Sequence, residues 1–270
     1  MKIDRTKPSV ARVYDYMIGG KDYFAADRAV AEKMLRVAPD APCNGKANRA
    51  FLRRAVTHMA QEAGIRQFLD IGSGLPTVEN VHEVAHEVDP AIRVVYVDHD
   101  PMVLTHGRAM LADDTTTTVI QADLREPETI LGHPEVRGFI DFREPVGLLL
   151  VAVLHHLADG EDPAGIAARF YRVLAPGSHV AISHFCNPGD RHPAASRLAV
   201  DSERVFTEHL GTGRFRSPEE IRALFGDLEL IEPGLVPPLE WRQDPETAAG
   251  ILPPDRDLYH CLYAGVARKV

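Results

Sequence analysis

A short apolar segment that runs into a glycine-rich loop constrains the fold of this 270-residue chain more than any other feature. Residues 66–71 (RQFLDI) favour a strand, residues 70–74 read DIGSG, and residues 76–88 favour a helix. The two glycines allow the backbone to turn sharply and to approach a ligand closely. In open α/β sheets, ligands bind beyond the carboxyl ends of the strands. This unit therefore predicts the first strand of such a sheet, with a binding loop at its end.

Strands and helices alternate through the middle of the sequence. Residues 146–154 (VGLLLVAVL) are apolar with almost no alternation, as expected for a strand that is buried on both faces. The alternation predicts right-handed crossovers and a parallel sheet. Later strands near 227–232 and 258–267 are expected to include an antiparallel edge. The remaining strands are predicted at 66–71, 92–97, 117–121 and 178–183, and the helices between strands at 76–88, 101–112 and 163–174.

Aspartates lie at or just after the ends of the first three predicted strands. Asp70 favours a cationic amino-acid ligand, because a carboxylate beside the loop attracts an ammonium group and repels a pyrophosphate. Asp98 ends the second strand and can accept hydrogen bonds from both hydroxyls of a ribose. Asp100 is predicted to cap the next helix. Asp123 follows the third strand and can accept from the amine of an adenine, against which Leu124 can pack.

Several stretches of the chain are similar to one family: 11–28 (ARVYDYMIGGKDYFAADR), 69–77 (LDIGSGLPT), 80–83 (NVHE) and 96–101 (YVDHDP). In them the chain resembles the S-adenosyl methyltransferase family long catalogued as a domain of unknown function, within the class I methyltransferase superfamily. The resemblance implies an α/β, Rossmann-like fold with a seven-stranded, mostly parallel sheet, helices on both faces and a helical N-terminal extension. It also implies methyltransferase activity with S-adenosylmethionine as cofactor. The expected cofactor-binding residues are Asp70, Gly72, Ser73, Gly74, Asp98, His99, Asp123, Leu124 and Tyr14.

The whole chain is expected to form one domain, because its length suits a single core. Its N-terminal helices are predicted to break at Gly19 and Gly20 and to resume after Asn44 as N-cap. The predicted parts are a helical N-terminal cover (1–60), a cofactor-binding core (64–185), an insertion or lid (186–216) and a C-terminal part of the sheet (217–270).

Catalytic residues are weakly indicated. His155 and His184 follow the fourth and fifth strands and are candidates for a base or a substrate-orienting group, or else are structural histidines of the cleft. Tyr14 either covers the cofactor or packs between helices. Direct methyl transfer needs mainly an aligned nucleophile, so no catalytic triad is expected.

Two other functions fit parts of the sequence. A non-catalytic regulator that binds S-adenosylmethionine would share the same loop. A nicotinamide-dependent oxidoreductase is opposed by Thr77, which stands where a dinucleotide-binding loop has its third glycine. The lack of a recognisable Tyr-x-x-x-Lys pair opposes it too.

Composition limits the partners. The net charge of −9 disfavours nucleic acid, and no apolar run approaches the ~20 residues of a membrane span. The N-terminus has no apolar core for a signal peptide. Three widely spaced cysteines predict free thiols in a reducing cytoplasm and no metal site. The basic excess within residues 1–60 either docks on the acidic body or attracts an anionic ligand.

A small-molecule substrate is expected between the cofactor, the N-terminal segment and residues 186–216. Basic residues of this insertion either select an anionic group or pair with its acidic residues, Asp190, Asp201, Glu203 and Glu208. These basic residues are Arg191, His192, Arg197, Arg204 and Arg214.

Overall fold

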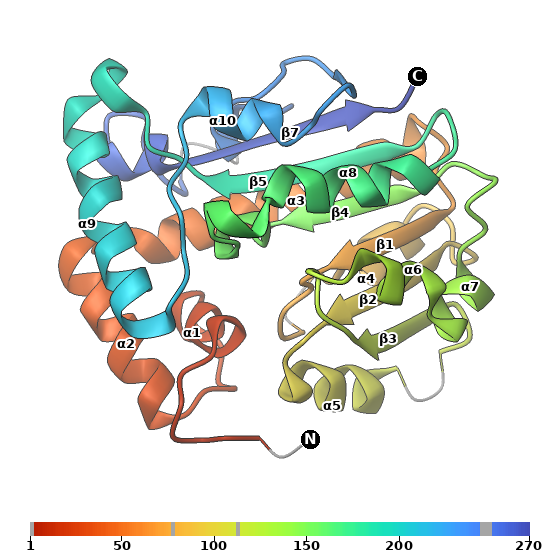
Figure 1. Cartoon of the computed structure of the whole chain (residues 1–270), viewed down its shortest axis with the longest axis horizontal. Coiled ribbons are helices and arrows are strands. Elements are labelled where there is room, and N and C mark those ends of the chain that lie inside the picture. The colour runs from red at the N-terminus through yellow and green to blue at the C-terminus, as the bar shows by residue number, and fades with distance from the viewer. Residues whose placement is uncertain (1–2, 77–78, 112–113, 244–249) are drawn as a thin grey trace.

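A seven-stranded sheet forms the centre of the computed structural model, which describes residues 3–76, 79–111, 114–243 and 250–270. Its strands are β1 (Gln67–Ile71), β2 (Arg93–Asp98), β3 (Thr117–Gln121), β4 (Gly147–Val151), β5 (His179–Phe185), β6 (Glu229–Leu230) and β7 (Leu262–Arg268). They lie in the order β3-β2-β1-β4-β5-β7-β6, and β1 to β5 are parallel. Strand β7 runs antiparallel to both of its neighbours, so the antiparallel strand is second from the edge (Figure 1). The predicted seven-stranded, mostly parallel sheet is confirmed.

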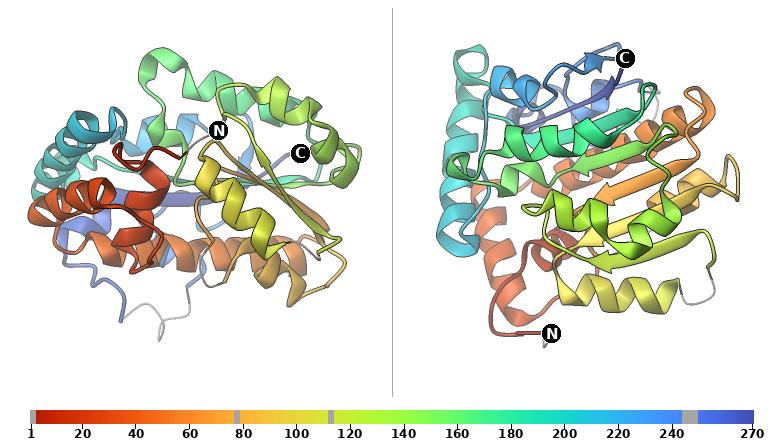
Figure 2. Two further views of the ribbon diagram at one scale, coloured as in Figure 1. Left: turned by 90° about the horizontal axis from the view of Figure 1, so that it is seen from below. Right: turned by 45° about the vertical axis from the view of Figure 1, so that its right-hand side comes forward.

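Side chains of the central strands alternate between two apolar cores. Leu69 and Leu148 belong to one core and Phe68 and Leu149 to the other, because successive strand residues point to opposite faces. Helices cover both faces (Figure 2). One face carries α3 (Ala41–Gln61), α4 (Val81–His86) and α5 (Pro101–Met110). The other carries α6 (Pro127–Gly132), α7 (Pro134–Phe139), α8 (Pro163–Val173) and α10 (Pro218–Ala223).

Three further helices lie at the edge to which the carboxyl ends of β1 to β5 point. They are α1 (Val10–Met17), α2 (Ala25–Val37) and α9 (Pro193–Leu210), grouped on the left of Figure 1. The break between α1 and α2 falls at Gly19, as predicted, with a left-handed φ of 88°. Helix α9 lies within the predicted insertion, which is partly helical.

Two helices begin at other residues than predicted. Helix α3 begins at Ala41, so Asn44 lies inside it, because Pro42 is tolerated in a first helical turn. Helix α4 begins at Val81 rather than residue 76, since Asn80 and Glu83 form a capping box. Thr77, used above against a dinucleotide loop, lies outside the described residues.

Strand ends differ as well. Strand β4 stops at Val151 rather than 154, because Ala152 has a left-handed φ of 55° and a 3-10 turn follows at Leu154–His156. Strand β5 continues to Phe185, two residues past its predicted end, and so includes His184. Strand β6 is shorter than predicted, and residues 257–261 are helical rather than extended. Helices α6 and α7 lie in a region for which no element was predicted.

In the described part of the chain, no helix is long and apolar enough to cross a membrane. The same residues contain no group of three or more His, Cys, Asp or Glu side chains placed to hold a metal ion. Cys43, Cys186 and Cys261 are free thiols.

Candidate functional site

A cavity of about 480 Å³ lies at the carboxyl ends of β1 to β4. Its walls come from the glycine-rich loop, from these strand ends, and from α1, α3 and α9. The cavity brings together residues that are far apart in the sequence. Its lining includes every predicted cofactor-binding residue: Tyr14, Asp70, Gly72, Ser73, Gly74, Asp98, His99, Asp123 and Leu124.

The loop after β1 needs its glycines for backbone conformation. Gly72 and Gly74 have left-handed φ angles of 72° and 69°. The N–H of Gly72 donates to the Val97 carbonyl at 2.7 Å, which ties the loop to β2. A Cβ at Gly72 would lie 2.3 Å from Val153 Cγ2, whereas one at Gly74 meets no described atom within 4 Å. Gly72 therefore serves both conformation and close packing, and Gly74 serves conformation.

Asp98 fixes the loop from the tip of β2. Its Oδ2 accepts from the Gly74 N–H at 2.9 Å and its Oδ1 accepts from the Asp100 N–H at 2.8 Å. Burial raises the pKa of Asp98, while these two N–H donors act in the opposite direction. Each carboxylate oxygen can accept a second hydrogen bond, so the side chain can still bind ligand hydroxyls.

Asp70 is a buried acid of the cavity with a large shift in pKa. Burial raises the pKa of Asp70 to about 7, with a further contribution from Asp98, while Arg49 on α3 opposes the shift. Near neutral pH the group is therefore divided between its acid and carboxylate forms. A cation bound beside it favours the carboxylate.

The other predicted cofactor-binding residues differ in the interactions that they already make with other residues of the protein. Arg125 pairs with the Asp123 carboxylate at 3.2 Å, and Leu124 is buried beside it. His99 is exposed, with Nδ1 3.6 Å from Asp98 Oδ1. The Tyr14 hydroxyl donates to the Gly45 carbonyl at 3.2 Å, so Tyr14 packs between α1 and α3 and also lines the cavity.

The two candidate catalytic histidines are placed differently. His155 lines the cavity, and its Nδ1 accepts from the Phe185 N–H at 3.3 Å. Burial holds the pKa of His155 well below its usual range, so the neutral ring carries its proton on Nε2 and offers a donor rather than a base. His184 is not part of the described lining. Its Nδ1 donates to the Phe185 carbonyl at 2.7 Å and its Nε2 accepts from Arg216 at 2.9 Å, so it is a structural histidine.

Sequence reasoning missed several lining residues. The cavity lining also includes Asn44 and Asn48 of α3, Ser202 of α9, and His156, which follows His155 in the sequence. Burial lowers the pKa of His156 to about 3, and its Nδ1 has no partner among the described residues. The adjacent histidines His155 and His156 can be seen as a pair in the sequence. The other groups come together only through the tertiary packing of α3 and α9.

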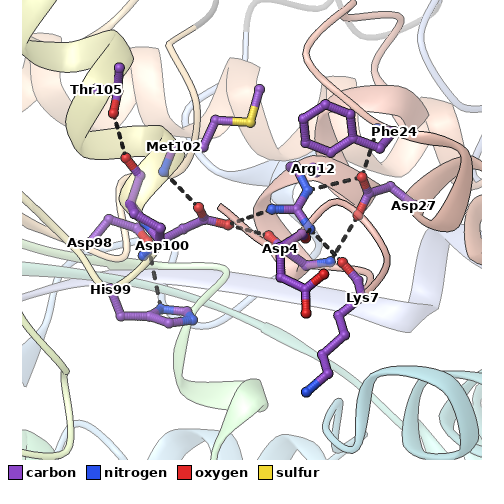
Figure 3. Close-up of polar contacts among 12 residues, drawn as sticks. Asp4, Lys7, Arg12, Phe24, Asp27, Asp98, His99, Asp100, Met102 and Thr105 are labelled. Atoms are coloured by element: carbon purple, nitrogen blue, oxygen red, sulfur yellow. Dashed lines mark hydrogen bonds and ion pairs between the residues drawn. The ribbon is translucent and has the colours of Figure 1, made fainter. Parts of the chain in front are cut away.

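Buried ion pairs of Arg12 hold the N-terminal segment against the loop between β2 and α5 (Figure 3). Arg12 Nε lies 2.9 Å from Asp27 Oδ2, and Arg12 Nη1 lies 3.6 Å from Asp100 Oδ2. All three side chains are buried. Asp100 also accepts from Ser9 Oγ and, as predicted for a helix cap, from the Met102 N–H at 2.8 Å. At Arg12, the basic N-terminal segment thus docks on the acidic body.

Several basic residues of the insertion form ion pairs. Arg204 pairs with Asp201 at 3.2 Å, and Arg214 pairs with Asp159 at 3.1 Å and with Glu203. The cavity lining, as far as the structure describes it, includes none of Arg191, His192, Arg197, Arg204 and Arg214. Arg204 and Arg214 thus form the ion pairs that one interpretation predicted, and Arg191 pairs with Glu219 beyond the insertion.

The cavity residues fit an adenosyl amino acid. The buried carboxylate of Asp98 has free acceptor capacity for ribose hydroxyls, and Asp70 can charge beside an ammonium group. Leu124 offers an apolar contact for a base. Three carboxylates in one cavity disfavour a pyrophosphate.

Comparisons with known proteins agree with this fit. The family model described as S-adenosyl methyltransferase matches residues 1–270. A structure from Thermobifida fusca YX, assigned as a methyltransferase, is 46% identical, with a TM-score of 0.90, and the match covers 98% of this chain and 96% of that one. A DUF574 family protein of Streptomyces avermitilis MA-4680 is 41% identical over 100% of both chains, with a TM-score of 0.92.

More distant structures share the fold alone. The mitomycin 7-O-methyltransferase MmcR is 16% identical, with a TM-score of 0.53, over 89% of this chain and 57% of that one. No curated protein matches the chain significantly. The family match opposes the nicotinamide-dependent alternative. This chain belongs to the S-adenosyl methyltransferase family and is an S-adenosylmethionine-dependent methyltransferase.

Proposed function

We propose that the protein transfers a methyl group from S-adenosylmethionine to a small molecule held in the same cavity. One observation carries the proposal: the cavity extends from the glycine-rich loop to a second region walled by α1, α2 and α9. A walled cavity excludes water and suits a small acceptor better than a polymer chain.

Cofactor contacts follow from the charged end of the cavity. In this proposal Asp98 accepts from the ribose hydroxyls, Asp123 and Leu124 contact the adenine, and Asp70 faces the ammonium group. The bound cofactor supplies an electrophilic methyl group on a sulfonium. The lining residues would hold the acceptor so that its lone pair could take this methyl group as the sulfonium becomes a neutral thioether, and the acceptor's proton would leave to bulk water with the products. Alignment within the cavity supplies most of the rate, consistent with the lack of an evident base at His155.

Affinity for S-adenosylmethionine should rise with pH through neutrality. Burial raises the pKa of Asp70 to about 7, so the group is protonated below that pH and is a carboxylate above it. The carboxylate attracts the cationic cofactor, so its Kd should fall between about pH 6 and pH 8 and then level off. Calorimetric titration across this range measures the effect.

Asp70→Asn is the matched control, since it keeps the shape of the side chain and removes the titration. Its Kd should stay flat over the same range. A slope that persists in Asp70→Asn, or affinity that falls with rising pH in the wild type, would contradict the role given to Asp70.

A labelling experiment tests the proposal for a small acceptor. Purified protein with methyl-labelled S-adenosylmethionine is added to an extract of the native cells, which is then separated into small-molecule, protein and nucleic-acid fractions. We expect label in the small-molecule fraction, and none from the Gly72→Val variant run in parallel. Label confined to protein or nucleic acid would refute a small acceptor.

A further inference from the structure

The polarity of the cavity changes from one end to the other. Its charged lining residues are three aspartates at the ends of β1 to β3, Arg125 beside them, and Arg49 on α3. The described lining from α1, α2, α9 and residues 257–262 has no charged side chain. This uncharged end is lined by Val13, Met17, Met34, Ala38, Phe206, Leu210, Leu258 and Leu262.

Aromatic rings form one wall of the uncharged end. The Phe185 ring lies between His155, with ring centroids 3.7 Å apart, and Phe215, with centroids 4.6 Å apart, and both pairs are stacked. Phe206 of α9 is tilted against Phe185 at 5.1 Å. Because both faces of Phe185 are covered, its edge remains to contact a ligand. Aromatic ligands pack well against ring edges, which carry partial positive charge.

The polar groups of this wall itself are neutral, and Arg125, whose charge helps to lower the pKa of His156, is paired with Asp123 and Glu161. Burial keeps the pKa values of His155 and His156 far below neutrality, so neither ring is a cation. Ser202 adds a hydroxyl and Asn44 an amide. Such groups can hydrogen-bond a ligand hydroxyl or carbonyl, but they do not neutralise a charge, and burying an unpaired charge is costly.

We propose that the methyl acceptor is an uncharged aromatic molecule bearing a hydroxyl or similar polar group, packed against Phe185, Phe206 and Phe215. This inference rests on the proposed function and names its substrate class. It takes the place of the anionic acceptor considered from the sequence, because the described lining includes none of the basic residues of the insertion.

Three matched probes test the class: naphthol, naphthoate and the saturated alcohol decalol. Each is titrated at neutral pH into protein loaded with S-adenosylhomocysteine, and binding is followed by calorimetry. Naphthol should bind more tightly than naphthoate by on the order of tenfold or more, because the carboxylate has no partner at this end. Naphthol should exceed decalol by about threefold to tenfold, the contribution of edge-to-face packing.

Substitutions on α9 sharpen the test. Phe206→Leu should weaken naphthol binding and leave decalol little changed. Phe206→Arg should reverse the preference toward naphthoate by placing a cation at this end. Val200→Arg, at an exposed position of the same helix outside the described lining, should keep the wild-type order.

Outcomes separate this inference from the proposed function. Equal or tighter binding of naphthoate or decalol by the wild type, or binding of none of the probes, overturns the aromatic, uncharged acceptor even if the extract assay labels small molecules. Label confined to macromolecules in that assay overturns the small acceptor itself, and this inference with it.

Discussion

Arg12→Met should lower the free energy of unfolding by about 3–5 kcal/mol, because it leaves two buried carboxylates without their partner. Asp27 and Asp100 are both buried against Arg12, at 2.9 and 3.6 Å. Asp27 keeps bonds from the Ser9 and Phe24 N–H groups, and Asp100 keeps those from the Met102 N–H and Ser9 Oγ, but none of these donors carries a full charge. Denaturant titration of both proteins, with and without S-adenosylhomocysteine, measures the loss.

Arg28→Met is the matched control on the neighbouring helix. Arg28 pairs with Glu32 at 2.7 Å, but the pair is exposed, and exposed pairs contribute little. Its stability should stay close to that of the wild type. Equal losses in the two variants would show that burial of the Arg12 cluster does not matter.

Gly72→Val should raise the Kd for S-adenosylhomocysteine by on the order of a hundredfold or more. A β-branched residue at the left-handed φ of 72° is strained by about 1–3 kcal/mol. The added Cβ would also lie 2.3 Å from Val153 Cγ2, and overpacking of this kind costs about 1–3 kcal/mol. The loop would relieve the backbone strain and the clash with Val153 by moving away from its position in the cavity wall.

Gly74→Ala separates the two causes. Its φ of 69° is equally unfavourable, but its Cβ meets no described atom within 4 Å. The Gly74→Ala variant should therefore have backbone strain but no steric clash, and its affinity for S-adenosylhomocysteine should fall less than that of Gly72→Val. Circular dichroism confirms that each variant is folded. Native affinity in a folded Gly72→Val protein would remove this loop from the cofactor site.

Local signals predicted the cofactor end of the site well. Gly72, Asp98 and Asp123 lie next to strands with clear apolar patterns, and parallel strands bring their carboxyl ends to one edge. The cap at Asp100 follows from short-range hydrogen bonding, and the structure has it. These features depend on residues close in sequence.

Other features depend on distant contacts. The end of β4 is set by the left-handed Ala152, which an apolar run cannot reveal. The start of α3 ahead of Asn44 depends on Pro42 in its first turn, which reads equally well as a loop. The tautomer of His155 follows from the hydrogen bond that it accepts from the Phe185 N–H, thirty residues away on β5. The sequence placed a substrate between the N-terminal segment and residues 186–216, but it did not reveal the uncharged lining there, because the side chains of α1, α2 and α9 that form it meet only in the folded chain.

The two ends of the cavity come from different stretches of the chain. Apart from Arg49, its charged lining lies between residues 70 and 125, whereas the uncharged end is supplied by residues before 53 and after 184 together with His155 and His156. Mutations in the second set alter the shape offered to an acceptor and leave the loop and the strand-end aspartates intact. Natural selection or protein engineering can therefore change the acceptor of such a chain without changing the residues that bind the methyl donor.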